Sequence, residues 1–249
     1  MRLNLINIYN ILDTGNRMKK PHFATNSFYH IYNRGVEKRD VFLDAKDYFR
    51  FIHDLFEFND EAPALNLYYK LPSFKSYEVE PRKIIRKREL LVDIIAYCLM
   101  PNHFHLLLRQ RQEDGIVRFM QKLGTGYTMY FNQKYQRVGA LFQGRFRAAL
   151  IEKESHFVYL PHYIHLNPLD LYMPDWRDRR ISDWRKAIKY LRSYRWSSYP
   201  DYIGEKNFPS LMLMHYIREL FGSSKIYSES LREWIADMDF NLLAHVILE

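Results

Sequence analysis

The chain has 249 residues, of which 47% are hydrophobic and 27% charged, so its composition is that of a globular protein and excludes a mostly disordered chain. Lysine and arginine outnumber aspartate and glutamate by 37 to 29, which gives a formal net charge of +8 at pH 7. Aromatic residues reach 16%, and a basic, aromatic chain favours a polyanionic partner whose bases can stack on side chains. The alternative is a basic enzyme with a well-packed aromatic core.

The single cysteine, Cys98, excludes an intramolecular disulfide and a cysteine-rich zinc module. No stretch approaches the roughly 18 apolar residues of a membrane span. Residues 1–20 lack the small-residue cleavage site of a signal peptide. We therefore expect a cytoplasmic protein without a membrane partner.

The positive charge is concentrated in residues 82–147, where thirteen basic side chains accompany four acidic ones, whereas residues 205–249 are acidic. Such a segment is a candidate phosphate-binding surface, because each neutralised phosphate releases counterions. The basic run at 82–88 fits a solvated helix face equally well.

Hydrophobic periodicity predicts alternating strands and helices along the chain. Four strands are expected, the second and third paired as a hairpin: 27–34, 91–100, 103–109 and one ending near 151. Three helices are expected: 44–58, 115–135 and 155–166. Asp44 and Ser155 are candidate N-caps. The order predicts an α+β fold, a ferredoxin-like sandwich with an antiparallel sheet and helices packed on one face.

His103 and His105 lie two residues apart on a predicted strand, where residues i and i+2 point to the same face. Phe104 and Leu106 would then face the core. Two imidazoles on one strand face form half of a divalent-metal site, although most such pairs are packed or hydrogen-bonded rings.

Tyr163 and Asn167 lie four residues apart on a predicted helix, which places a hydroxyl and an amide on one face. Tyr29 and Asn33 share this spacing, but on a strand such residues are roughly 13 Å apart. Taken alone, Tyr163 is better explained as a core aromatic of an amphipathic helix. His162 and His165 flank Tyr163 but are expected to face away from it, so no general base is evident.

Five segments carry recognisable motifs: YHIYNRGVEKRDVF, AYCLMPNHFHLLL, LFQGRFRAALI, YIHLNP and WSSYPDYIG. They stand in the order seen in REP-associated tyrosine transposases, which the chain resembles from about residue 25 to residue 204. These enzymes belong to the HUH (His-hydrophobic-His) single-tyrosine superfamily. The resemblance implies a ferredoxin-like fold and a divalent metal ion, Mg²⁺ or Mn²⁺, held by two histidines and an amide. Carried over by position, His103 and His105 are the histidine pair, Asn167 the third ligand and Tyr163 the nucleophile.

The resemblance further implies a transposase that cleaves and rejoins single-stranded DNA at hairpin-containing, REP-like sequences through a 5′-phosphotyrosine. Single-stranded or hairpin DNA is the expected partner, and a homodimer is compatible with the resemblance. The chain would then comprise an N-terminal extension (1–24), a transposase-like catalytic domain (25–204) with an insertion at about 59–90, and a C-terminal helical appendage (205–249).

Arg145 and Arg147, in the GRFR segment, are the first candidates for DNA contacts. Further candidate cations share the basic segment or flank the first strand: Arg118, Lys122 and Arg34. Three aromatic side chains are candidates for base stacking, with core packing as the alternative: Tyr29, Tyr32 and Phe142.

Two features depart from the resemblance: LDLYMPDW replaces the usual small basic segment after Pro168, and the insertion at 59–90 is long. Other branches of the superfamily place the nucleophile on the earlier long helix, which makes Tyr127 the alternative nucleophile. Two other functions compete with transposition: a non-catalytic, domesticated regulator that binds DNA hairpins, and a hydrolytic metal nuclease that uses activated water.

Overall fold

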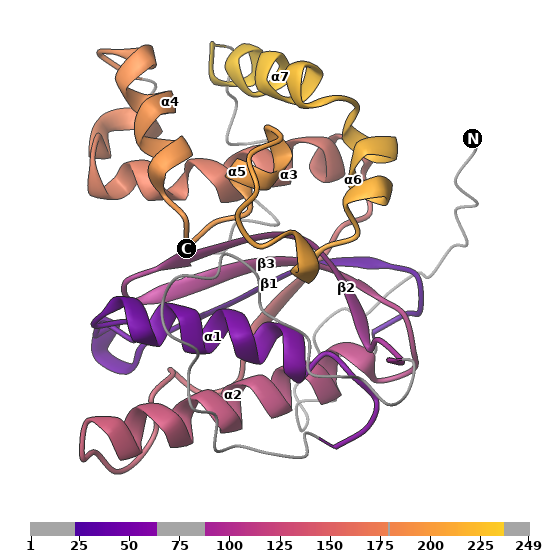
Figure 1. Cartoon of the computed structure of the whole chain (residues 1–249), viewed down its shortest axis with the longest axis vertical. Helices are drawn as coiled ribbons and strands as arrows, with labels where there is room; N and C mark the ends of the chain where they lie inside the picture. Colours follow the sequence, from indigo (N-terminus) through magenta and orange to yellow (C-terminus); the bar gives the residue numbers. More distant parts are fainter. Residues whose placement is uncertain (1–22, 64–87, 179, 237–249) are drawn as a thin grey trace, which may run out of the picture.

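The computed structural model describes residues 23–63, 88–178 and 180–236, shown in colour in Figure 1. Most of the predicted N-terminal extension, the centre of the predicted insertion and the last residues of the predicted appendage lie outside the described residues.

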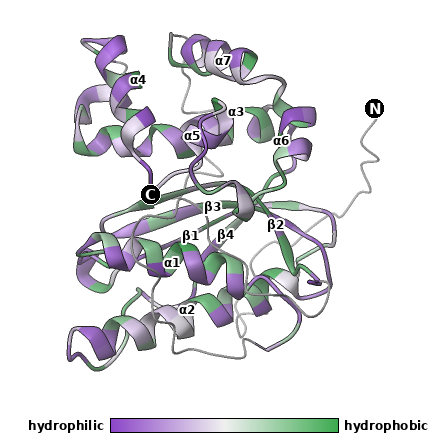
Figure 2. Cartoon of the chain, in the orientation of Figure 1, coloured by the Kyte–Doolittle hydropathy of each residue, from purple (hydrophilic) through white to green (hydrophobic). Residues whose placement is uncertain are grey.

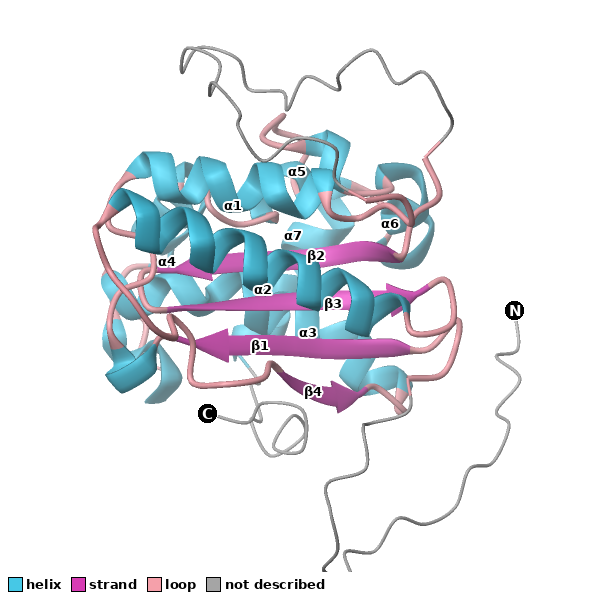
Figure 3. Ribbon diagram, turned by 90° about the horizontal axis from the view of Figure 1, so that it is seen from below, coloured by secondary structure: helices cyan, strands magenta, loops and turns pink. Residues whose placement is uncertain are grey.

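Four antiparallel strands form one sheet in the order β2-β3-β1-β4, as Figure 3 shows. Their bounds are Phe28–Arg34 (β1), Val92–Met100 (β2), His103–Gln110 (β3) and Arg147–Leu150 (β4). Every residue of β2 is buried, as expected for a continuous apolar run covered on both faces of a sheet. Pro101 and Asn102 connect β2 to β3, so the predicted hairpin is confirmed.

Two helices, α1 (Ala45–Glu57) and α2 (Gly115–Lys134), cover one face of the sheet (Figures 1 and 3). Asp44 is the N-cap of α1 and forms a capping box with Asp47. The Asp44 carboxylate accepts from the Asp47 backbone N–H, and the Asp47 carboxylate accepts from the Asp44 backbone N–H. The order β1-α1-β2-β3-α2-β4, with both helices on one face, confirms the predicted ferredoxin-like α+β fold.

A second layer of helices covers the opposite face, which the sequence-based prediction did not anticipate (Figure 1). It contains α3 to α7: Glu154–Leu166, Trp184–Ser193, Tyr199–Tyr202, Met214–Phe221 and Ser224–Ala236. Three short 3-10 helices accompany them: η2 (Asn167–Leu171), η3 (Pro174–Asp178) and η4 (Pro209–Leu211). A fourth, η1 (Val36–Lys38), follows β1. The second layer is needed because this sheet face also carries fully buried apolar side chains, Ala96 and Leu107 among them.

Helix α3 starts one residue earlier than predicted, so the proposed N-cap at Ser155 is wrong. Lys153 occupies the N-cap position and makes no side-chain cap hydrogen bond, while Ser155 lies in the first turn. The helix ends at Leu166, immediately before Asn167 and Pro168 begin η2, as the position of the proline predicts.

The outer edge of β2 is paired with chain from the C-terminal part of the protein. The Leu99 N–H donates to the Trp196 carbonyl at 2.9 Å, and the Ser198 N–H donates to the Tyr97 carbonyl at 3.0 Å. Further along, Met212 makes a parallel bridge to Ile94. These contacts satisfy backbone groups that an open sheet edge would expose.

Hydrophobic residues concentrate in the strands, whereas the outer sides of α1, α2 and α4 are hydrophilic (Figure 2). Among the described helices, none combines the length and the apolar character required to cross a membrane.

Two buried histidines of α3 tie this helix to the C-terminal helices. The His162 ring stacks on Tyr227 of α7 at 4.8 Å between centroids, and its Nδ1 donates to the Val158 carbonyl at 3.1 Å. His165 Nδ1 lies 2.6 Å from the Tyr227 hydroxyl, and its Nε2 lies 2.7 Å from the Ser198 hydroxyl. Burial lowers the pKa of His162 to about 3 and that of His165 well below its ordinary value, so both stay neutral.

We predict that acid destabilises the fold through these histidines. The unfolded chain binds a proton near pH 6.5, whereas folded His162 does not, so stability is full above that pH and is lost as the pH falls toward the folded pKa. At about pH 5, His162 alone accounts for about 2 kcal/mol of lost stability. Urea unfolding at about pH 7.5 and about pH 5 measures this loss, which His162→Phe should reduce. Equal losses in both proteins would contradict the assignment.

Candidate active site

The register of β1 against β3 assembles a polar cluster on the sheet face beneath α3. Tyr32 pairs with His105 and Arg34 pairs with His103, and directly opposite residues share a face. The ring centroids of His103 and His105 are 4.9 Å apart, with the rings nearly perpendicular at 89°. The two histidines therefore share one face, as predicted.

The side chain between the two histidines points the other way. Phe104 packs against Phe51 of α1, with ring centroids 5.1 Å apart, on the side of the sheet that α1 and α2 cover. The alternation of β3 thus separates an imidazole face from an aromatic core.

Each imidazole of the pair is oriented by a contact at Nδ1. His103 Nδ1 lies 2.5 Å from Asn102 Oδ1, which can only accept, so Nδ1 carries the proton and the lone pair is at Nε2. His105 Nδ1 lies 3.0 Å from Nε2 of His30, a buried neighbour on β1. Such contacts to the second nitrogen orient metal-binding histidines in general, and both rings would bind a metal ion through Nε2.

Helix α3 brings Tyr163 to this cluster. Its side chain is fully buried, and its ring packs edge-on against His105 and His30, with centroids 5.9 Å and 6.5 Å apart. Asn167, at the end of the same helix, is also buried, and its Nδ2 donates to the Tyr163 carbonyl at 2.9 Å. The predicted tyrosine is thus adjacent to the predicted histidine pair, with Asn167 one helical turn further along.

Arg177 of η3 joins Tyr163 and Asn167, and sequence reasoning missed it. Its Nη1 donates to the Tyr163 hydroxyl at 3.3 Å, and its Nη2 donates to Asn167 Oδ1 at 3.1 Å. The Asp170 carboxylate accepts from the same guanidinium at 3.0 Å and 2.7 Å. No local periodicity identifies this arginine, because a change of chain direction after α3 makes the contacts.

The alternative nucleophile, Tyr127, lies on the opposite side of the sheet. It is fully buried in α2, and its hydroxyl donates to the Val41 carbonyl at 2.6 Å. Its ring packs against Phe42 and Phe51, with centroids 5.5 Å and 4.9 Å apart. Burial raises the pKa of Tyr127 well above its ordinary value.

Two of the five predicted DNA-binding cations belong to the histidine side, and a third lies in a loop beside β1. Arg147 is exposed on β4 and pairs with Tyr32, while half-buried Arg34 pairs with His103. Arg145 is exposed in the loop before β4, and Asn33 of β1 contacts this loop by donating to the Gly144 carbonyl at 3.1 Å.

The structure does not bring the other two predicted cations to the cluster. Arg118 and Lys122 lie on α2, on the far side of the sheet. Arg118 pairs with the Glu61 carboxylate at 3.6 Å, and Lys122 donates to the Asp60 and Ala62 carbonyls at 2.6 Å and 2.9 Å.

The three candidates for base stacking also differ in where they lie relative to the histidine pair. Tyr29 is buried, and its hydroxyl accepts from the Ala24 N–H at 2.8 Å. Phe142 packs against Phe104 in the core, with centroids 5.7 Å apart. Tyr32 is also buried, and it alone of the three lies directly beside His105, with ring centroids 6.1 Å apart.

The family comparison identifies the part of the chain that carries this cluster. Residues 75–167 match the family described as IS200-like transposases. The matched segment includes His103, His105, Tyr163 and Asn167, so over residues 75–167 the resemblance to these transposases is confirmed.

A solved structure of a REP-associated tyrosine transposase bound to a REP hairpin is similar over 78% of this chain and 90% of that chain, with 12% sequence identity and a TM-score of 0.48. No curated protein matches the chain significantly.

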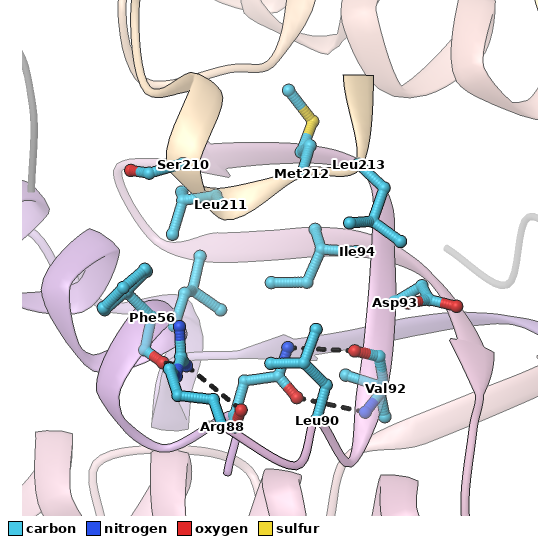
Figure 4. Close-up of a pocket in the computed structure, with 12 residues that line it drawn as sticks. Phe56, Arg88, Leu90, Val92, Asp93, Ile94, Ser210, Leu211, Met212 and Leu213 are labelled. Atoms are coloured by element: carbon cyan, nitrogen blue, oxygen red, sulfur yellow. Dashed lines mark hydrogen bonds between the residues drawn. The ribbon is translucent and has the colours of Figure 1, made fainter. Parts of the chain in front are cut away.

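A small pocket lies away from the histidine–tyrosine cluster, between the end of α1, the start of β2 and residues 210–213 (Figure 4). The Arg88 guanidinium closes one side by donating to the Phe56 and Asn59 carbonyls. With a volume of about 40 Å³, the pocket holds no more than one or two water molecules.

We predict that Cys98, which pairs with His105 across β2 and β3, is unreactive in the folded protein. Burial raises the pKa of its thiol well above the ordinary value, and the nearby Asp170 charge raises it further, so the reactive thiolate is scarce. Ellman's reagent should react with it only after denaturant is added. Rapid reaction under native conditions would show that the sheet face is open.

Proposed function

We propose that this protein is a metal-dependent single-stranded DNA transposase that cleaves and rejoins DNA at hairpin-containing sequences through Tyr163. The observation that carries this proposal is the contact between the Tyr163 and His105 rings, on the sheet face that also carries His103. The match of residues 75–167 to the IS200-like transposases supports this proposal, because all four predicted site residues lie within the matched segment.

The residues present fit a divalent ion at the histidine pair. His103 and His105 would bind it through Nε2, and imidazole nitrogen suits Mn²⁺ better than Mg²⁺, which prefers oxygen ligands. Within the described part of the chain, no group of three or more His, Cys, Asp or Glu side chains could hold a metal ion. The third ligand is assigned, as the resemblance implies, to the Asn167 amide oxygen, whose second lone pair remains when Arg177 takes one.

The reaction assigned to Tyr163 is attack of its hydroxyl oxygen on the scissile phosphorus. A phosphorus–oxygen bond to Tyr163 forms and the bond to the 3′ oxygen breaks, which leaves a 5′-phosphotyrosine. The phenol proton passes to solvent, and the departing 3′ oxygen takes a proton from solvent to become a 3′-hydroxyl. A bound divalent ion would offset the negative charge on the phosphate oxygens. Because the phosphodiester energy is kept in the covalent bond, a second 3′-hydroxyl reverses the step and joins strands without ATP.

Neither flanking histidine is assigned a role as general base. His162 is stacked on Tyr227, and both nitrogens of His165 contact hydroxyl groups of the C-terminal layer. Their side chains serve the packing of α3 instead.

The DNA backbone is assigned to Arg34 and Arg147 on the histidine side and to Arg145 in the exposed loop before β4, with an unpaired base stacked on Tyr32. Arg147 pairs with Tyr32 across β1 and β4, so a phosphate contact and a stacking contact would lie side by side. Arg118 and Lys122 are excluded from this surface by their contacts with residues 60–62.

The complete burial of Tyr163 favours a second candidate, a non-catalytic protein that binds DNA hairpins. Cleavage requires the tyrosine to meet DNA, so α3 and η3 must move together relative to the sheet, whereas binding alone does not require this. The hydrolytic nuclease reading differs from both in releasing its product without a protein–DNA bond.

We predict that wild-type protein forms a covalent adduct with single-stranded hairpin DNA in the presence of Mg²⁺ or Mn²⁺, seen as a shifted band on a denaturing gel. Tyr163→Phe should abolish the adduct because the attacking oxygen is removed. Tyr127→Phe is the matched control, since it removes the hydroxyl of another fully buried tyrosine and should leave the adduct intact.

His103→Ala and His105→Ala should lose the adduct while they keep DNA binding. An adduct that persists in Tyr163→Phe contradicts the assignment, and cleavage without any adduct favours the nuclease. DNA binding without cleavage in the wild type favours the non-catalytic protein.

We further predict that His30→Leu weakens Mn²⁺ binding by about 10-fold or more, because the contact that orients His105 is lost. Isothermal titration with Mn²⁺ in the absence of DNA measures this effect. Leu108, on the opposite face of the sheet, provides a control in Leu108→Val, which should bind Mn²⁺ as the wild type does. Unchanged affinity in His30→Leu would contradict the role of His30.

A further inference from the structure

We propose that Arg177 is a positioning residue that holds the Tyr163 hydroxyl and the Asn167 amide oxygen in one fixed arrangement. This inference rests on the proposed function, since it assigns the two groups to one reaction. Arg177 lies outside the segment 75–167 that matches the IS200-like transposases. It follows the segment LDLYMPDW, where the sequence departs from the resemblance.

The guanidinium is itself held in place by two side chains of that segment. Both oxygens of Asp170 accept from Arg177, at 3.0 Å and 2.7 Å, and the Trp176 indole N–H donates to the same carboxylate at 2.6 Å. Trp176 is fully buried, and its ring lies 4.7 Å from the centre of the guanidinium. The planar fork of arginine loses little freedom when it is bound in this way.

From this anchor the guanidinium reaches two groups on α3 and η2 at once. Nη1 contacts the Tyr163 hydroxyl and Nη2 contacts Asn167 Oδ1, while Asn167 Nδ2 donates to the Tyr163 carbonyl. The guanidinium centre also lies 5.4 Å from the Tyr163 ring. Tyrosine and asparagine are thus linked through a side chain and through the backbone, so they move as one unit.

This arrangement has a chemical consequence for the attacking oxygen. Arginine only donates, so the Tyr163 oxygen accepts from it and directs its own hydrogen away from the guanidinium. A donor fixed beside the oxygen limits the directions in which its lone pairs can point, and such alignment contributes strongly to the rate of an attack. Because Asp170 balances its charge, the half-buried guanidinium can stay beside Tyr163 without DNA.

The test compares Arg177→Ala and Arg177→Lys with Arg180→Ala. Arg180, three residues after Arg177, is a matched control because it is exposed and pairs with the Asp178 carboxylate at 2.7 Å. The rate of adduct formation at saturating DNA and the Kd for DNA are measured separately. We expect Arg177→Ala to lower the rate about 100-fold while the Kd changes less than about threefold.

Arg177→Lys should retain an intermediate rate, because one ammonium group cannot replace both forks of the guanidinium. Added guanidinium ion should partly restore Arg177→Ala and leave Arg180→Ala unchanged. If Arg177→Ala keeps the wild-type rate at saturating DNA, the proposal is overturned. A loss confined to the Kd also overturns it and makes Arg177 a DNA-binding residue.

A second measurement needs neither DNA nor metal. With 3-fluorotyrosine at position 163, the ¹⁹F signal should move in Arg177→Ala and in Asp170→Asn but not in Arg180→Ala. If the wild type forms no adduct, the proposed function fails, while the ¹⁹F signal still shows whether Arg177 holds Tyr163. An unmoved signal in a folded Arg177→Ala or Arg177→Lys protein overturns the positioning role.

Discussion

The pairing register of β1 with β3 is the constraint on which the rest of the structure depends. It places Tyr32 and Arg34 opposite His105 and His103, so that one sheet face carries the polar cluster. A slip of one residue would turn the imidazole of His30 toward the aromatic core around Phe51. Because helices cover both faces, the register is strongly specified by burial, and the histidine contacts follow from it.

The second helical layer converts this polar sheet face into an enclosed site. Helix α3 is packed between the sheet and α7, where His165 contacts both Tyr227 and Ser198. Burial strengthens electrostatic interactions around Tyr163, and it also requires each polar group to find a partner. Arg177 meets this requirement for Tyr163 and Asn167 together, so the same contacts serve both the stability of the layer and the chemistry proposed for it.

The basic segment shows how charge density and binding surface differ. Several of its cations are used inside the fold: Arg109 and Arg111 contact the buried Asp93 carboxylate, at 2.7 Å and 2.9 Å, and Lys134 contacts Asp47 at 2.7 Å. Arg145 and Arg147, near β4, are exposed instead. The sequence located the excess positive charge. Only the packing of α2 and the sheet showed which of these cations form ion pairs inside the fold and which are exposed.

Local patterns in the sequence were sufficient for the ferredoxin-like order of elements, the shared face of His103 and His105 and the one-turn spacing of Tyr163 and Asn167. Each follows from a period of two or 3.6 residues, which neighbouring positions alone define. The tertiary structure decided the second helical layer, the sides on which Tyr127, Arg118 and Lys122 lie, and the contacts of His30 and Arg177. His30 and His105 are 75 residues apart, and Arg177 reaches Tyr163 across 14 residues and a change of chain direction. No local period relates such positions, because only the closing of the sheet and the turn after α3 bring them within hydrogen-bond distance.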